Sequence, residues 1–250
     1  HSSTSTSTLA EADAAIDRMF AGAFGAAGAE VLVEECMTGE ELSLFALTDG
    51  EYFHMLPVAQ DHKRLGEGDT GPNTGGMGAY SPVALATDDV KQRVASSIIA
   101  PTLAEMRRRA IPFRGLLYVG VMLTTDGPRV VEFNCRFGDP ETQVVLPLLE
   151  SRLVDLLVGA SEEGGMARVA SPRARAGAAV TTVVASPGYP DTPFTGGSIR
   201  LPAETDGVVI FHAGTACRDD GTLVTSGGRV FAVTAVAGTF EAAQRASVST

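Results

Sequence analysis

Residues 115–134, GLLYVGVMLTTDGPRVVEFN, decide the fold more than any other stretch of this sequence. Two apolar runs, residues 115–123 and 129–133, flank Asp126-Gly127, a pair that is typical of a tight turn between antiparallel strands. Both runs are almost continuously apolar rather than alternating, so we expect both strands to be buried on both faces.

Helical and strand patterns extend outward from this pair of strands. Apolar residues at helical spacing predict helices over residues 9–24, 88–109 with a break at Pro101, 140–160 with a break at Pro147, and from 240. Thr87 and Asp139 are the expected N-caps of the second and third of these helices. Strands are expected at residues 30–35, 41–48, 52–58, 179–186, 208–214, 222–225 and 227–236, with a hairpin across Asp49-Gly50.

A glycine-rich stretch, QDHKRLGEGDTGPNTGGMGAYSP at residues 60–82, has no periodicity and predicts a long loop. Its composition leaves two interpretations open. It is a flexible loop, or it is a cradle whose backbone N–H groups approach phosphate or carboxylate oxygens, with Lys63 and Arg64 as nearby cations. Neither GxxxxGK[ST] nor GxGxxG occurs in the sequence.

Composition excludes several classes of function. The 250 residues suggest one or two domains, and 19 basic against 30 acidic residues give a net charge of −11. This balance argues against a nucleic acid or a membrane surface as a partner, although a small anionic ligand needs only a few local cations. The longest apolar run, residues 116–123, is much shorter than the roughly 20 residues that span a bilayer.

The cysteines and histidines predict no metal site of their own. Cys36, Cys135 and Cys217 form no CxxC pair, so we expect three reduced, mostly buried thiols and a cytoplasmic protein. The four histidines show no HExxH spacing, so a histidine-based zinc site is not expected.

Glu132 and Asn134 stand two residues apart at the end of a strand, and alternate residues of a strand face the same way. A carboxylate and an amide oxygen side by side suit Mg²⁺, although a polar strand end that caps the next turn has the same pattern. Arg136 follows directly. It is either a salt-bridge partner of these residues or a bidentate clamp on a bound phosphate.

The acidic stretch Glu34-Glu-Cys-Met-Thr-Gly-Glu-Glu41 also has two interpretations. It is a charged hairpin loop, or it is a purine slot in which backbone groups after Glu34 meet the adenine edge. In the second case Glu41 would accept hydrogen bonds from ribose hydroxyls.

Two long motifs carry a family resemblance. Residues 60–82, followed by EFNCRFGDPETQ at residues 132–143, resemble the glycinamide ribonucleotide synthetases (phosphoribosylamine–glycine ligases), ATP-grasp enzymes of purine synthesis. The similarity runs from about residue 9 to 244, and FHAGT with TSGGRVFAVTA at residues 211–235 resembles the C-terminal β-rich domain of that family.

The resemblance implies an α+β fold in which an ATP-grasp lobe, an antiparallel sheet with helices, precedes a small β-rich domain. We expect a low-complexity arm at residues 1–8, a partial ATP-grasp domain at 9–165 and a truncated β-rich domain at 172–250. The stretch at residues 161–177, which is small, polar and arginine-containing, is the plausible boundary.

The resemblance also implies the activity, in which glycine attacks the γ-phosphate of ATP and 5-phosphoribosylamine displaces phosphate from glycyl phosphate. The cofactor would be ATP with Mg²⁺ or Mn²⁺, and these small molecules would be the partners. The implied nucleotide-binding residues are Glu34, Glu35, Met37 and Glu41, and the implied metal ligands are Glu132 and Asn134. The implied catalytic cations are Lys63 and Arg136, and the implied substrate-loop residues are Asp61, His62 and Asn73.

The sequence lacks the N-terminal domain, the earlier ATP-grasp half and the last C-terminal helix that the family pattern includes. We therefore expect a fragment that is weakly active or inactive by itself and that would need the N-terminal lobe as a partner. The alternative is a non-catalytic lobe that acts at most as a nucleotide-binding module.

Overall fold

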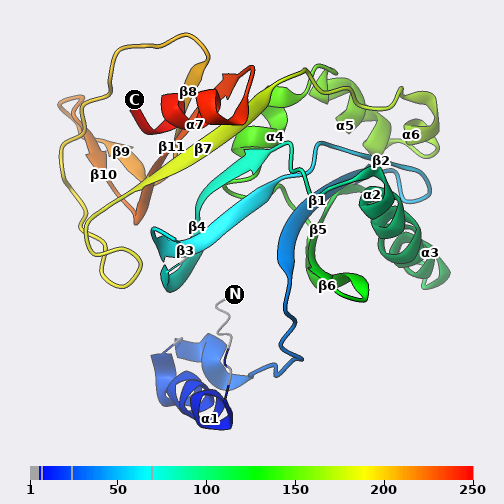
Figure 1. Cartoon of the computed structure of the whole chain (residues 1–250), viewed down its shortest axis with the longest axis horizontal. Coiled ribbons are helices and arrows are strands. Elements are labelled where there is room, and N and C mark those ends of the chain that lie inside the picture. The colour runs from blue at the N-terminus through cyan, green and yellow to red at the C-terminus, as the bar shows by residue number, and fades with distance from the viewer. Residues whose placement is uncertain (1–5, 7, 24, 69, 250) are drawn as a thin grey trace. The chain divides into compact units, whose positions relative to one another are not determined.

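The structure is a computed structural model that describes residues 6, 8–23, 25–68 and 70–249 (Figure 1). The chain forms two compact units, His1–Gly39 and Glu40–Thr250. The low-complexity arm expected at residues 1–8 lies almost wholly outside the described residues.

The first unit contains the helix predicted at its start. Helix α1 (Leu9–Arg18) begins at a capping box, in which Thr8 Oγ1 accepts from the Glu11 N–H and the Glu11 carboxylate accepts from the Thr8 N–H. A π turn, η1 (Met19–Ala23), and a 3₁₀ turn, η2 (Gly25–Ala29), follow it.

The prediction of a strand at residues 30–35 is wrong. Residues 31–38 belong to no helix or strand, and the side chains of Leu32 and Val33 are 80% and 74% exposed. A strand forms where a neighbour pairs with its backbone, and among the described residues of this unit there is no other strand. The alternating apolar pattern therefore has nothing to pack against.

The predicted central hairpin is confirmed in the second unit. Strands β5 (Gly115–Thr124) and β6 (Gly127–Asn134) pair antiparallel, and β1 (Glu40–Thr48) pairs with the other edge of β5. Strand β2 (Phe53–Met55) completes the sheet in the order β2-β1-β5-β6, which confirms the hairpin across Asp49-Gly50.

The predicted burial on both faces is confirmed for β5 but is wrong for β6. Leu116 to Val121 of β5 are buried, as expected for a strand between two packed layers. Strand β6 is not buried on both faces, because it is the edge strand of its sheet, and Phe133 is 42% exposed. An apolar run cannot by itself distinguish a central strand from an edge strand.

The glycine-rich stretch is a pair of strands, so the predicted loop is wrong. Strands β3 (Gln60–Gly66) and β4 (Thr70–Ser81) form an irregular antiparallel hairpin whose register shifts twice between His62 and Gly66. Strand β4 continues into a larger sheet by pairing with β7 (Ala178–Ala185). Glycine has no side chain and therefore leaves no alternation that would reveal a strand in the sequence.

The short strands predicted after residue 178 are confirmed. Strands β8 (Val208–His212) and β11 (Arg229–Ala237) join β7 in a sheet of order β3-β4-β7-β11-β8. Strands β9 (Thr215–Cys217) and β10 (Leu223–Thr225) form a separate hairpin. Helix α7 (Phe240–Ser249) packs on β7 and β11 (Figure 1). The five-stranded sheet thus combines strands from both sides of residues 161–177, and the proposed domain limits stay a prediction.

Helices cover the two faces of the four-stranded sheet. On one face lie α2 (Asp88–Val94), the π turn η3 (Ala95–Ile99) and α3 (Ala100–Arg108). Their buried residues Val94, Ile99 and Leu103 belong to the same apolar core as Leu42 and Leu44 of β1. The Thr87 cap is confirmed, because its Oγ1 accepts from the Val90 N–H.

The opposite face of the sheet packs on α4 (Thr142–Leu148), α5 (Leu153–Ser161) and α6 (Gly165–Arg168). Asp139 is not the N-cap of α4, because Glu141 occupies that position and makes no side-chain cap. The carboxylate of Asp139 instead accepts from Arg229 of β11, so a long-range ion pair replaces the predicted cap.

The exposure of the cysteines and the length of the helices bear on two further predictions. Cys36, Cys135 and Cys217 are free and exposed, which corrects the prediction of mostly buried thiols. Cys135 follows an edge strand and Cys217 ends a three-residue strand, so neither reaches a core. Among the described residues, no helix is both long enough and apolar enough to span a bilayer.

Candidate functional site

The candidate site lies beside the apolar core, at the part of the four-stranded sheet where buried apolar side chains are followed by polar ones. Along β1, alternate residues on one face change from Glu41 and Ser43 to the buried Phe45. Ser43 lies opposite Gly120 of β5, and Gly120 lies opposite Glu132 of β6, so these positions form one row across the sheet. The same Ser43 bridges to Ala59, which joins this sheet to the segment that enters β3.

Glu132 and Asn134 lie together, as their spacing predicts. Asn134 Nδ2 donates to Glu132 Oε1 at 2.9 Å, which leaves the Asn134 Oδ1 oxygen as an acceptor. A Cβ at Gly120 would lie 3.4 Å from Glu132 Cγ and 3.4 Å from the Tyr118 ring, so both side chains lean over this glycine.

These two oxygen-bearing side chains could serve a divalent cation. Mg²⁺ commonly takes one or two protein oxygens and completes its shell with phosphate oxygens and water. Within the described residues, no group of three or more His, Cys, Asp or Glu could hold a metal ion. Glu132 and Asn134 therefore fit a cation that arrives with other ligands and do not form a protein-only cage.

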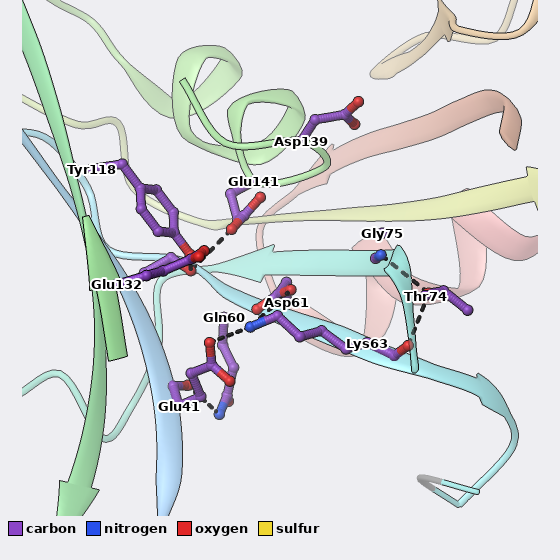
Figure 2. Close-up of polar contacts among 12 residues, drawn as sticks. Glu41, Gln60, Asp61, Lys63, Thr74, Gly75, Tyr118, Glu132, Asp139 and Glu141 are labelled. Carbon is purple, nitrogen blue, oxygen red and sulfur yellow. Dashed lines mark hydrogen bonds and ion pairs between the residues drawn. The ribbon is translucent and has the colours of Figure 1, made fainter. Parts of the chain in front are cut away.

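A half-buried lysine, Lys63, joins β3 to β1. The Lys63 Nζ forms an ion pair with Glu41 Oε1 and lies 3.9 Å from Asp61 Oδ2, so its ammonium lies between the two carboxylates (Figure 2). Gln60 supports this arrangement, because its Nε2 donates to the Glu41 carbonyl at 2.9 Å. The structure thus brings Glu41 of β1 to the predicted pair Asp61 and Lys63, although 22 residues separate Glu41 from Lys63 in the chain.

The electrostatics of this cluster follow from burial and crowding of acids. Burial raises the pKa of Asp61 to about 7, with Lys63 opposing the rise and the Glu141 and Glu41 carboxylates adding to it. Burial would lower the pKa of Lys63, but the carboxylates of Asp61 and Glu41 outweigh it and hold that pKa above its ordinary value. The lysine therefore stays charged, while the Asp61 carboxyl group titrates close to neutral pH.

Sequence reasoning assigned no role to a second buried network beside the cluster. Glu141, which is 4% exposed, accepts from Ser43 Oγ at 3.0 Å, and the Ser43 and Tyr118 hydroxyls are 2.9 Å apart. Burial raises the pKa of Tyr118, so this phenol stays protonated. Ser43 was visible as a single polar residue in an apolar strand, and Glu141 as the last acid of the GDPE motif. Nothing in the sequence joined them.

Other predicted residues are not brought into the cluster. His62 is exposed on the opposite face of β3 from Lys63, and its ring stacks on Tyr80 with centroids 6.0 Å apart. Asn73 is exposed on β4. Arg136 is exposed, and its Nη1 donates to the Phe137 carbonyl at 2.9 Å.

Glu34, Glu35 and Met37 belong to the first unit. Glu34 and Glu35 are exposed and Met37 is half-buried, all within the stretch that forms no helix or strand. Their expected contact with adenine stays a prediction.

Comparison with solved structures identifies the class of fold. The chain is similar to the biotin carboxylase domain of a thermophilic 2-oxoglutarate carboxylase over 97% of its own length and 54% of that chain. The TM-score is 0.60 and the identity 14%, so this likeness concerns the fold alone. The model of an ATP-grasp domain matches more than half of this chain, which is therefore of the ATP-grasp class.

Sequence comparison identifies the family within that class. The family described as "Phosphoribosylglycinamide synthetase, ATP-grasp (A) domain" matches residues 3–142, and the C domain of the same synthetase matches residues 179–250. The chain belongs to the phosphoribosylglycinamide synthetase family, which confirms the resemblance found in its motifs.

Relatives named phosphoribosylamine–glycine ligase support this assignment. The Chlorobaculum tepidum protein is 53% identical over 88% of this chain and 52% of its own length. The Mesorhizobium japonicum protein is 50% identical over 95% of this chain and 56% of its own length. The Thermotoga maritima crystal structure, 38% identical, has a TM-score of 0.76 over 86% of this chain and 53% of that one. This chain spans about half the length of the curated relatives it matches.

Proposed function

We propose that this chain carries the metal- and phosphate-binding side of a phosphoribosylamine–glycine ligase, which joins glycine to 5-phosphoribosylamine at the expense of ATP. The observation that carries the proposal is the meeting of two family motifs at one place. Lys63, from the glycine-rich motif, reaches the same face of the sheet that holds Glu132 and Asn134 from the second motif.

The chemistry requires two anions to meet. A carboxylate oxygen of glycine attacks the γ-phosphorus of ATP, and ADP leaves with the electron pair of the broken P–O bond. The amine of phosphoribosylamine then attacks the carbonyl carbon of the acyl phosphate. The C–O bond to phosphate breaks, and the amine loses a proton as the amide forms. The first step brings two anions together, and the second develops negative charge on the carbonyl oxygen and the leaving phosphate, so cations fixed at the site lower both barriers.

The residues divide this work by charge. We assign the metal to Glu132 and Asn134, where a bound divalent cation would neutralise phosphate oxygens. Lys63 and Arg136 supply fixed positive charge beside the phosphates and the acyl group. Glu41 has two carboxylate oxygens, so one can hold Lys63 while the other accepts from a ribose hydroxyl.

The remaining assignments depend on the family resemblance. Backbone and side chains around Glu34, Glu35 and Met37 would meet adenine, and Asp61, His62 and Asn73 would serve the glycine and phosphoribosylamine side. ATP with Mg²⁺ or Mn²⁺ is the proposed cofactor. A biotin carboxylase domain from Hydrogenobacter thermophilus, similar in fold with a TM-score of 0.56 at 14% identity, was crystallised with MgADP, which fits this choice.

The test is ADP release that depends on both glycine and phosphoribosylamine. The chain is assayed alone and after addition of the part of the Chlorobaculum tepidum relative that lies outside the match. We expect release in at least one of these two mixtures, and Glu132→Gln to lower it by at least about 100-fold by removing a metal ligand.

Glu163→Gln is the matched control, because Glu163 is exposed on the surface and pairs only weakly with Arg114 at 3.4 Å. Mg·ATP binding without ADP release in either mixture would support the alternative, a non-catalytic nucleotide-binding module. Equal rates in Glu132→Gln and the unchanged chain would remove Glu132 from the metal site.

A further inference from the structure

One cation from the last long strand contacts both family motifs. Arg229, the first residue of β11, donates from Nη1 to the carbonyl oxygens of Gly75 at 2.6 Å, Gly76 at 3.3 Å and Asp139 at 3.1 Å. Its Nη2 donates to the Asp139 carboxylate at 3.0 Å. The Arg229 side chain is 22% exposed, so water competes little for these contacts.

The backbone at Gly75 is held from both sides by the C-terminal strands and loops. Its carbonyl accepts from Arg229, and its N–H donates to the Tyr189 hydroxyl at 3.1 Å. A Cβ at Gly75 would lie 3.2 Å from the Arg229 guanidinium carbon, so a glycine lets the arginine approach this closely.

From Gly76, whose carbonyl also accepts from Arg229, the contacts lead to the half-buried Lys63. Gly76 N–H donates to Thr74 Oγ1 at 3.1 Å, and Thr74 Oγ1 donates to the Lys63 carbonyl at 2.8 Å (Figure 2). The backbone that carries the Lys63 ammonium is thus connected to Arg229 through two residues.

From Asp139 the contacts lead to the other motif. The Asp139 carboxylate points away from the Lys63 cluster (Figure 2) and accepts from Gln143 Nε2 at 2.9 Å as well as from Arg229. Glu141, two residues further, is the buried acid that accepts from Ser43. The segment between Asn134 and Glu141 is therefore fixed at its middle by the same guanidinium.

We propose that Arg229 is a positioning residue of the candidate site, which holds the Gly75–Gly76 backbone and the Asp139 segment at a fixed spacing. The residues that Arg229 would position are Lys63 on one side and Glu132 and Asn134 on the other. This proposal rests on the proposed function for the roles of these three residues. The planar fork of arginine is needed, because one nitrogen serves the carbonyl oxygens while the other serves the carboxylate. A lysine ammonium can replace part of this but cannot span both partners.

The experiment compares Arg229→Gln and Arg229→Lys with Arg218→Gln in the full 250-residue chain. Arg218 is a matched control, because its Nη2 also donates to a backbone carbonyl, that of Gly196 at 2.7 Å, away from both motifs. Amide hydrogen exchange is followed in peptides covering residues 72–80, 136–145 and, as an internal reference, β1. The affinity for Mg·ATP is measured by titration.

In Arg229→Gln we expect exchange at least about tenfold faster in residues 72–80 and 136–145, with β1 unchanged, because charge-assisted contacts to both segments are lost. Arg229→Lys should recover part of the protection, and Arg218→Gln should match the unchanged chain. Mg·ATP affinity should fall in Arg229→Gln and recover in part in Arg229→Lys.

If Arg229→Gln unfolds, Asp139→Asn keeps the proposal testable. It weakens only the contact between Arg229 Nη2 and the Asp139 side chain. It should give the same exchange pattern to a smaller extent, and its effect should not add to that of Arg229→Lys, since both variants disturb one interaction. Unchanged exchange in both peptides, or an equal change in Arg218→Gln, would overturn the proposal.

The two proposals fail separately. If the unchanged chain binds no Mg·ATP, the proposed function fails, while the exchange comparison still decides whether Arg229 holds the two segments. If the chain binds Mg·ATP and exchange rises in Arg229→Gln without any loss of affinity, the arginine serves the fold and not the site.

Discussion

At the scale of single residues, the site depends on a carboxyl group that is buried beside one lysine and two further acids. The side chain of Asp61 is 6% exposed and lies 3.9 Å from Lys63, which also pairs with Glu41. Burial of this carboxyl group, to which the nearby Glu141 and Glu41 carboxylates add, outweighs the attraction of Lys63 and raises the pKa of Asp61 to about 7, whereas a simple exposed ion pair would lower it.

Asp61→Asn tests this electrostatic account through the pH dependence of stability. The folded chain keeps the Asp61 proton up to about pH 7, whereas the unfolded chain loses it near the ordinary value of 3.8. The stability that this proton contributes is therefore fully present below pH 3.8 and is lost as the pH rises to about 7. In Asp61→Asn this loss of stability should be absent. The free energy of unfolding of the variant should therefore rise relative to that of the unchanged chain between pH 5 and pH 8.

Urea unfolding at several pH values measures the difference in unfolding free energy between the two proteins. We expect that difference to move by roughly 1 kcal/mol or more over this range, since one pKa unit corresponds to about 1.4 kcal/mol. Asp89→Asn on the exposed side of α2 is the control and should leave the pH profile unchanged. Parallel profiles for Asp61→Asn and the unchanged chain would contradict the raised pKa.

At the scale of elements, β4 shows why glycine is needed inside a strand. Gly78 faces the Thr181 carbonyl so closely that a Cβ would lie 2.7 Å from it. Gly76 has φ +106°, and a Cβ there would lie 2.4 Å from Pro140 Cδ. The glycines let two backbones and the Asp139–Pro140 segment approach at the site, which side chains would prevent.

Gly76→Ala should destabilise the fold by about 3 kcal/mol or more, because the strain of a positive φ adds to a clash with Pro140. Gly68→Ala is the matched control. Gly68 also has a positive φ, +69°, but a Cβ there meets nothing within 4 Å, so we expect a cost of only about 1 kcal/mol. Thermal or urea unfolding measures both values, and equal losses in the two variants would show that the contact with Pro140 is unimportant.

At the scale of the whole molecule, the second unit has two apolar cores on opposite faces of one sheet. One core lies under the α2–α3 segment, and the other joins the four-stranded sheet to α4, α5 and the five-stranded sheet. Because the five-stranded sheet pairs β4 with β7, the glycine-rich hairpin and the C-terminal strands belong to one hydrogen-bonded structure.

Limited proteolysis tests the division into units. A glutamate-specific protease should cut first at residues 30–35, which are outside any helix or strand, and leave a fragment that contains Glu40–Thr250. Mass spectrometry identifies the cut, and thermal unfolding of the fragment should remain a single cooperative transition. A first cut at Glu67, in the turn between the paired strands β3 and β4, would contradict the expected order.

Local patterns in the sequence determined several of the hairpins, a helix start and one pair of site residues. The apolar runs with their Asp-Gly turns predicted the hairpins, Thr87 predicted its helix start, and a spacing of two placed Glu132 beside Asn134. The two long motifs also identified the family. These features depend on residues that are neighbours in the chain, where a period of 2 or 3.6 or a single cap is a sufficient physical cause.

Only the tertiary structure decided the rest. It turned the glycine-rich stretch into strands, left residues 31–38 without a partner strand and placed β6 at an edge. It also brought Lys63 to Glu41 and Arg229 to Asp139 across 22 and 90 residues of chain. Such contacts follow from which strands pair over long distances. That pairing is selected by the burial and hydrogen bonding of the whole fold, so no local pattern encodes it.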